Sequence, residues 1–260
     1  MIFESHAHYD DKAFDEDREA LISSLPENGI KTIINVSSDL GSVERTIALS
    51  KQYDYIYGAI GIHPSDAAEL NDEKFQWIKE KAMEEKMVAI GEIGLDYYWP
   101  EPDHEIQKEW FIKQLQLAKE LNKPVIIHSR DAAADTLSIM EKEAADLRGV
   151  IHCYSYSKEM AKNFLKMGYY FGIGGVITFS NAKKLVETVE YVPLENILLE
   201  TDCPYLAPVP NRGKRNSSLN LTYVAEKIAE IKGVPYDTVI DVTRKNANKL
   251  FFGKEEPWQI

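Results

Sequence analysis

Short strand-like runs alternate with amphipathic stretches along the whole chain, and this alternation constrains the fold more than any other feature. The runs are apolar and lie at residues 2–6, 32–36, 55–60, 88–93, 124–128, 150–152, 169–173 and 197–201. Helical patterns occur at residues 105–121, 160–166, 219–231 and 236–252. Strands that alternate with helices predict a parallel sheet, and eight such units close into a barrel.

The length of 260 residues agrees with one such barrel, which typically needs about 250 residues. We therefore predict an α/β protein, a (β/α)8 TIM barrel with an extra C-terminal helix, forming one domain over residues 1–260. An open doubly wound sheet is the alternative. It would need a glycine-rich phosphate turn after the first strand, and Ser5-His6-Ala7-His8 is unlike one.

The sequence contains no run of about 18 apolar residues and does not start with a basic segment followed by an apolar one. We therefore expect a cytosolic protein that neither spans a membrane nor is exported. The two cysteines, Cys153 and Cys203, are too few for a disulfide framework, and we expect reduced thiols that fill small apolar spaces.

The formal net charge of −12 argues against a protein that binds nucleic acid through a broad basic surface. A local site is still compatible with this charge. Two bound divalent cations would add four positive charges at the point where a phosphate must lie.

Residues of the types that bind metals collect where the strands end, and this is the edge that carries the active site of a TIM barrel. His6 and His8 are at alternate positions of the first strand, so both project from the same face. Later strand ends supply Glu92, His128, His152 and Asp202, and His63 follows the third strand. A lone histidine at a strand end is usually a structural residue, but this collection at one rim indicates a metal site. The remaining histidine, His104, falls in the loop before the helical pattern at 105–121.

These residues belong to longer motifs through which the chain resembles the TatD family of metal-dependent hydrolases, within the amidohydrolase-like TIM-barrel superfamily. The motifs are Ser-His-Ala-His-Tyr-Asp at 5–10, Gly-Ile-His-Pro at 61–64, Gly-Glu-Ile-Gly-Leu-Asp-Tyr-Tyr at 91–98, Pro-Val-Ile-Ile-His-Ser-Arg at 124–130, His-Cys-Tyr-Ser at 152–155, Glu-Thr-Asp-Cys-Pro-Tyr-Leu at 200–206, Arg-Gly-Lys-Arg-Asn at 212–216 and a closing stretch at 246–251. The resemblance implies a two-metal site and a DNase activity of the 3′ to 5′ exonuclease type.

The resemblance also implies which residues hold the ions. One ion would be held by His6, His8, Glu92 and Asp202. The other would be held by Glu92, His128 and His152, so that Glu92 bridges the pair. Zinc, manganese and magnesium all remain open, because mixed imidazole and carboxylate ligands accept each of them.

A two-metal site suits phosphodiester hydrolysis by a metal-activated water. Glu92 and Asp202 are the predicted catalytic residues, with Asp202 either accepting or orienting the proton of that water or acting as a ligand alone. His63 either contacts a substrate phosphate, as the resemblance implies, or orders its loop through a hydrogen bond.

Aromatic and basic residues near the predicted site suit a single-stranded or frayed DNA end, because bases stack on aromatic rings and cations bind phosphates. The predicted substrate contacts are Tyr97 with its neighbours Tyr98 and Trp99, and the basic residues Arg130, Arg212, Lys214 and Arg215. Alternatively, the aromatic residues pack a loop and the basic residues form a solvated turn.

Two other functions would use the same residues. A hydrolase of C–N or C–O bonds in a small molecule needs the same metal ligands, since an activated water also attacks a carbonyl carbon. A noncatalytic scaffold stabilised by metal is disfavoured, because a structural zinc site closes with four ligands. The sequence leaves open the choice between DNA and RNA, the polarity of digestion and the oligomeric state.

The chain departs from the family pattern at two places. Glu4 stands where aspartate is common, and Ser217-Ser218 stand where Glu-Pro is frequent. Neither change removes a predicted ligand. The change at Glu4 concerns the support around His6 and His8, and the change at Ser217-Ser218 concerns the outer substrate contacts.

Overall fold

The computed structural model describes residues 1–254 and confirms the predicted (β/α)8 barrel. Neighbouring strands of its eight-stranded sheet pair in parallel, in the order β1-β2-β3-β4-β5-β6-β7-β8. The strands are β1 Ile2–Ala7, β2 Ile30–Val36, β3 Ile56–Ile60, β4 Met87–Asp96, β5 Val125–Arg130, β6 Gly149–Ile151, β7 Tyr170–Ile173 and β8 Ile197–Leu199. The single domain over residues 1–260 stays a prediction, and its residues 255–260 lie outside the described part.

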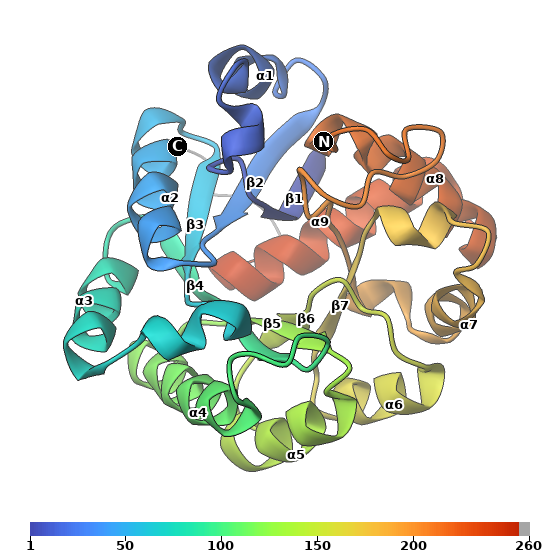
Figure 1. Ribbon diagram of the computed structural model, residues 1–260. Helices are drawn as coiled ribbons and strands as arrows, with labels where there is room; N and C mark the ends of the chain where they lie inside the picture. The colour runs from blue at the N-terminus through green and yellow to red at the C-terminus, as the bar shows by residue number, and fades with distance from the viewer. Residues whose placement is uncertain (255–260) are drawn as a thin grey trace.

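Helices connect successive strands and form the outer ring of the barrel (Figure 1). They are α1 Arg18–Ser24, α2 Leu40–Gln52, α3 Asp72–Ala82, α4 His104–Leu121, α5 Ala133–Glu143, α6 Lys158–Lys166, α7 Lys183–Tyr191, α8 Leu221–Lys232 and α9 Tyr236–Phe252. Short 3-10 helices are η1 Lys12–Phe14, η2 Pro64–Glu69, η3 Gly175–Thr178, η4 Leu194–Asn196 and η5 Ser218–Asn220. The four predicted helices correspond to α4, α6, α8 and α9, and α9 is the extra C-terminal helix.

Two central strands extend further than the sequence predicts. β4 continues to Asp96 and β5 continues to Arg130, because Leu95 and Asp96 go on pairing with Ser129 and Arg130. Glu92 and His128 therefore lie inside these strands, whereas the sequence analysis placed them at the ends. His128 pairs with Gly94 of β4, whereas Glu92 lies at a register shift between Ile90 and Ile93, where its N–H donates to the carbonyl of Ser37. These backbone interactions make a more rigid base for a site than a loop would.

The barrel interior and α9 share one apolar cluster. Inward-facing residues of the strands, among them Phe3 and Val36, pack with Leu250 and Phe251 of α9. The rings of Phe3 and Phe251 stack with their centroids 5.9 Å apart. α9 runs across the barrel (Figure 1) and buries the apolar end of its interior. A larger cluster lies between the outer face of the sheet and the surrounding helices.

Across residues 1–254, none of the helices has both the length and the apolar character needed to cross a bilayer.

Replacing Phe251 with alanine tests the contribution of α9. The side chain is buried and stacked, so its loss should lower the free energy of unfolding by about 3–5 kcal/mol. Urea unfolding followed by circular dichroism measures this change. Met83→Ala is the control, because Met83 is 55% exposed and its loss should cost no more than about 0.5 kcal/mol. Equal effects of the two substitutions would show that α9 does not hold the barrel closed.

Candidate metal centre

The two histidines at the end of β1 face one another. Their Nε2 atoms lie 3.1 Å apart, and both side chains are buried. The Nδ1 atom of His8 lies 2.8 Å from the carbonyl oxygen of Val36, which can only accept a hydrogen bond. Nδ1 of His8 therefore carries a proton. Burial opposes protonation of His8, but Asp202 and Glu92 outweigh burial and raise its pKa to about 9. A bound cation would displace the proton from Nε2, which faces both carboxylates, and take the lone pair of that nitrogen.

Glu92 of β4 lies between these histidines and those of β5 and β6. One carboxylate oxygen, Oε1, is 2.7 Å from Nδ1 of His128 and 2.7 Å from Nε2 of His152. The other oxygen, Oε2, is 3.4 Å from Nε2 of His6 and 3.8 Å from Nε2 of His8. The two oxygens of this side chain thus face two separate pairs of histidines.

Asp202 closes the centre from the loop after β8. Its Oδ1 atom lies 3.3 Å from Nε2 of His8 and 3.7 Å from Nε2 of His6. Asp202 has a φ angle of 56°, in the left-handed region that aspartate tolerates better than most residues. The imidazole of His152 stacks on that of His6 with the ring centroids 4.0 Å apart. The fold therefore brings all six predicted ligand residues together.

The electrostatics of the centre favour a bound cation. Burial would raise the pKa of Glu92, but His152, His128 and His6 outweigh this effect and hold its pKa well below its usual range. Burial likewise opposes ionisation of Asp202, and the hydrogen bond with His8 and the charge of His152 keep its pKa low. Two ionised carboxylates in a buried site need compensating charge, from partners or from metal ions.

The ring nitrogens also fit a metal. Groups of three side chains whose ligand atoms lie within 4.8 Å of one another include His6, His8 and Glu92, and also His6, His152 and Asp202. A metal ion needs unprotonated nitrogens, and His8 provides one at Nε2 once the cation has displaced the proton there. The Nδ1 atoms of His6 and His152 are buried without a hydrogen-bond partner among residues 1–254.

Two carboxylates lie behind the histidines, and one of them sets the orientation of an imidazole. Oδ2 of Asp96 lies 3.1 Å from Nε2 of His128, so this nitrogen donates and Nδ1 presents its lone pair to the centre. Glu200 lies behind His152, with 3.7 Å between its Oε1 atom and Nδ1 of His152. The sequence analysis assigned no role to Asp96 or Glu200. Asp96 follows Glu92 by four positions and Glu200 precedes Asp202 by two, and this even spacing is the signal that could have suggested a shared face.

His63 is close to the centre, and the nitrogen that faces the centre carries its proton. It precedes η2, and its Nδ1 atom accepts a hydrogen bond of 3.1 Å from the backbone N–H of Ser65. A neutral imidazole that accepts at Nδ1 carries its proton at Nε2. Nε2 of His63 lies 3.8 Å from Oε1 of Glu92. His63 therefore presents a hydrogen-bond donor to the centre, which suits an oxygen of a bound anion better than a metal ion.

Tyr97 is engaged inside the protein. Its hydroxyl donates a hydrogen bond of 2.8 Å to Asp135, and its ring stacks on that of His104 at 3.6 Å between centroids. His104 is the first residue of α4, not part of the preceding loop, because the side chain of Asp103 accepts from the N–H of Glu105 and caps the helix there. The predicted contact of Tyr97 with substrate would require these interactions to break.

The next two residues are exposed instead. Tyr98 is 52% exposed and Trp99 is 53% exposed, and their rings meet edge to face at 4.8 Å. The guanidinium of Arg130 lies 3.7 Å from the centre of the Tyr98 ring. The backbone N–H of Tyr98 donates to Asp96, which also orients His128. An aromatic and cationic surface is thus joined directly to one side of the centre.

The predicted basic residues of the loop after β8 differ in their surroundings. The guanidinium of Arg212 lies 4.4 Å above the ring of Phe179, and Lys214 is exposed. Arg215 forms a bidentate ion pair with Asp17, with distances of 2.7 Å and 2.6 Å, and donates to the carbonyl of Ala13. Arg215 therefore ties its loop to the segment before α1, and its predicted contact with substrate would require this ion pair to break.

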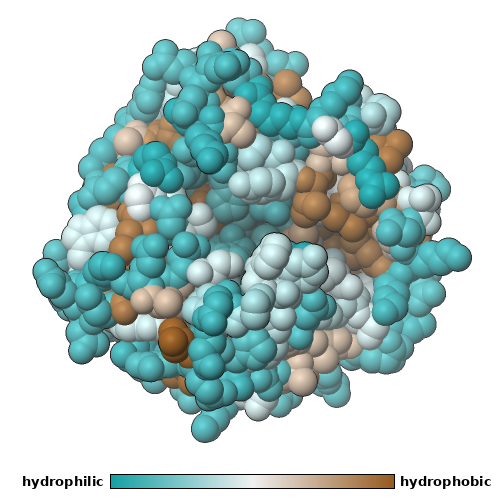
Figure 2. Space-filling view, viewed as in Figure 1, coloured by the Kyte–Doolittle hydropathy of each residue, from teal (hydrophilic) through white to brown (hydrophobic). Residues whose placement is uncertain are grey.

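The face shown in Figure 2 is hollowed near its middle, and the floor of the hollow is hydrophilic.

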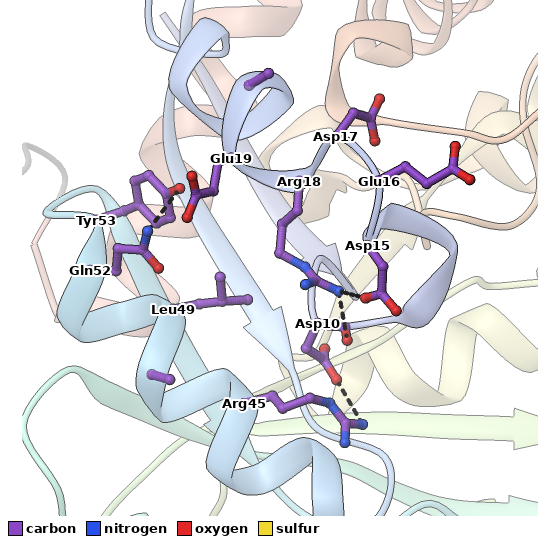
Figure 3. A pocket seen from close by; sticks show the side chains of 12 residues that line it. Asp10, Asp15, Glu16, Asp17, Arg18, Glu19, Arg45, Leu49, Gln52 and Tyr53 are labelled. Carbon is purple, nitrogen blue, oxygen red and sulfur yellow. Dashed lines mark hydrogen bonds and ion pairs between the residues drawn. The ribbon is translucent and has the colours of Figure 1, made fainter.

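A separate cavity, of about 580 Å³, lies between α1 and α2 (Figure 3). Its arginines already have partners: Arg18 donates to the carbonyls of Tyr9 and Asp11, and Arg45 pairs with Asp10. The described residues that line this cavity therefore offer no free cation to a ligand, and we assign no site to it.

Neither cysteine forms a disulfide, and the prediction that both fill small apolar spaces holds for one of them. Cys203 is buried in the apolar core and Cys153 is partly exposed beside the centre.

This chain is similar to known metal-dependent hydrolases over nearly its whole length. The family model described as TatD related DNase matches residues 3–252. The uncharacterized metal-dependent hydrolase YabD of Bacillus subtilis is 44% identical over 252 residues, which cover 96% of this chain and 99% of YabD. The uncharacterized metal-dependent hydrolase YcfH of Escherichia coli is 37% identical over 258 residues, 96% of each chain.

A solved structure is also similar to this chain over nearly its whole length. The crystal structure of YjjV, a TatD homologue from Escherichia coli K12, is similar with a TM-score of 0.90 and 31% identity, covering 96% of this chain and 97% of YjjV. The family match spans nearly all of the described residues, and the residues that could bind metal form one cluster. The chain therefore belongs to the TatD family of metal-dependent hydrolases.

Proposed function

We propose that this protein is a two-metal DNase that hydrolyses phosphodiester bonds at single-stranded or frayed DNA ends, of the 3′ to 5′ exonuclease type. The observation that carries the proposal is the placement of Glu92, whose two carboxylate oxygens face different pairs of histidines. A single carboxylate placed in this way can bridge two ions about 3.5–4 Å apart. The family description, TatD related DNase, supports DNA as the substrate.

The ligands divide into two sets around Glu92. His6, His8 and Asp202 would hold one ion together with Oε2 of Glu92, since the Nε2 atom of each histidine lies within 3.8 Å of both carboxylate oxygens in this set. His128 and His152 would hold the other ion with Oε1. Zinc, manganese and magnesium each suit this donor set.

Two such cations would lower the pKa of a water molecule toward about 7 and stabilise negative charge on the phosphate oxygens during hydrolysis. We assign to Asp202 the role of orienting that water or accepting its proton, because its side chain is 18% exposed whereas that of Glu92 is 4% exposed. His63 would donate from Nε2 to a nonbridging phosphate oxygen of such a substrate. Asp96 holds His128 in the ring orientation that this arrangement needs.

The outer contacts are Tyr98, Trp99, Arg130, Arg212 and Lys214. A guanidinium that lies flat on an aromatic ring keeps its in-plane donors free for phosphate and can stack a base on its outer face. Arg130 and Arg212 both lie over aromatic rings, those of Tyr98 and Phe179. Stacking contributes roughly 1–3 kcal/mol per base without demanding a sequence, which suits an enzyme that shortens any strand.

Digestion of labelled DNA tests the proposed activity. Protein reconstituted with zinc, manganese or magnesium should release the label of a 3′-labelled single strand first and should convert a 5′-labelled strand into a ladder of shorter products. A chelator should stop both reactions. Glu92→Gln keeps the size of the side chain but cannot bridge two ions, so it should fold, lose at least one metal equivalent and lose most activity.

Two results would count against the proposal. Intact DNA together with hydrolysis of a lactone or a cyclic amide would favour a small-molecule C–O or C–N hydrolase. A Glu92→Gln protein that retains two ions and near-wild-type turnover would contradict the bridging role of Glu92.

Substitutions in the loop after β8 test the phosphate contacts. Arg212→Ala combined with Lys214→Ala should weaken binding of single-stranded DNA and reduce the slope of log K against log salt by roughly 0.7 for each phosphate that is no longer neutralised. Binding titrations by fluorescence anisotropy at several salt concentrations measure the slope. Arg215→Ala is the matched control from the same loop, since its guanidinium is paired with Asp17. An equal reduction of the slope in this control would mean that Arg215 also binds phosphate.

Asp96→Ala tests how His128 is oriented. Loss of the acceptor frees the imidazole to rotate, and affinity for one zinc equivalent should fall about 10- to 100-fold while the fold is retained. Competition with a chromogenic chelator measures this affinity. Asp135→Ala removes a carboxylate that contacts Tyr97 instead of a histidine, and it should leave zinc affinity unchanged. Similar losses of zinc affinity in both variants would mean that removal of any nearby negative charge weakens zinc binding.

A further inference from the structure

The barrel has a seam between its first and last strands. Within residues 1–254, paired ladders join each strand to the next along the chain. β1 is joined to the segment after β8 by an isolated bridge between Ala7 and Cys203, and to β8 itself by the hydroxyl of Ser5, which donates to the carbonyl of Leu199. Two backbone hydrogen bonds cross beyond the end of β8, from His8 to Cys203 and from Asp202 to His6. His6 and His8 lie on one side of this seam and Asp202 lies on the other.

The buried side chain of Glu4 spans the seam. Its Oε1 atom accepts from the backbone N–H groups of His6 at 3.2 Å and Thr201 at 3.0 Å. Its Oε2 atom accepts from the hydroxyls of Thr201 at 2.7 Å and Ser218 at 2.9 Å. One carboxylate thus binds three segments: β1, the residue before Asp202, and the start of η5.

Ser218 completes this connection. Its hydroxyl accepts a hydrogen bond of 2.8 Å from Tyr9, and its backbone N–H donates to the same Tyr9 oxygen at 2.9 Å. Proline at this position would have neither the hydroxyl nor the N–H. Glu4 and Ser218, two of the three residues that the sequence analysis expects to depart from the family pattern, are in direct contact.

We propose that Glu4 is a positioning residue that fixes the spacing between His6 and His8 on one side of the seam and Asp202 on the other, and so sets the affinity for the ion these residues share. This inference rests on the proposed two-metal function. The physical reason is that few backbone hydrogen bonds join the two sides of this seam, so the hydrogen bonds of Glu4 add substantially to what holds the ligand set in place.

Zinc titrations of the full chain test the proposal without measuring catalysis. The wild-type protein should bind two equivalents. Glu4→Gln keeps the size of the side chain but replaces an acceptor oxygen with an amide donor, so it should weaken one equivalent about 10- to 100-fold and leave the other unchanged. Ser218→Ala removes one of the hydrogen-bond donors to Glu4, and it should weaken the same equivalent roughly 2- to 10-fold.

Double substitutions identify which equivalent is affected. Glu4 is proposed to act on the ion that Asp202 helps to hold. Once Asp202→Asn has weakened zinc binding at that ion, adding Glu4→Gln should therefore reduce the zinc affinity little further. Glu4→Gln should add fully to the loss caused by Asp96→Ala, which concerns the other ion. Circular dichroism establishes that each variant is folded, and Ser218→Ala carries the test if Glu4→Gln does not fold.

The outcomes separate the two proposals. A wild-type protein that binds two equivalents, with Glu4→Gln and Ser218→Ala of unchanged affinity, overturns the role of Glu4 alone. Fully additive losses of zinc affinity in Glu4→Gln and Asp202→Asn also overturn the role of Glu4 alone. A wild-type protein that binds fewer than two equivalents overturns the two-metal function, and the role of Glu4 with it.

Discussion

The carboxylate of Glu92 lies 2.7 Å from nitrogens of both His128 and His152, and its second oxygen faces His6. A buried charge of this kind is stable only when its neighbours compensate it, and here the compensation comes from histidines on separate segments of the chain. The positions of β1, β4, β5 and β6 around the barrel are thus coupled through one side chain. Any change that moves Glu92 must also change both groups of histidines.

A second layer of carboxylates lies behind the first. Asp96 orients His128, Glu200 lies behind His152, and Glu4 binds the backbone of His6. Each stands an even number of positions from a metal-binding candidate, because alternate residues of a strand face the same side. Only Glu4 shares its strand with the residue that it supports. Asp96 and Glu200 reach His128 and His152 on other segments, so the parallel pairing of the barrel is also needed to bring these acids into place.

Much of this arrangement could be predicted from the sequence, because strand periodicity and the barrel architecture together determine where strand ends meet. The sequence could not reveal that β4 and β5 continue past Glu92 and His128, since this depends on pairing between strands. It also could not reveal that Asp17 pairs with Arg215 or that Asp135 accepts from Tyr97. These partners are far apart in the sequence, and only tertiary packing brings them together.

The seam at Glu4 has a consequence for the order in which the chain folds. Thr201 and Ser218 are 197 and 214 residues away from Glu4, so these hydrogen bonds join segments that leave the ribosome at opposite ends of synthesis. Interactions of such long range form late, since a large loop must close first. A nascent chain that ends before Ser218 would already contain every side chain of the centre. It would still lack one of the three segments that hold those side chains in register.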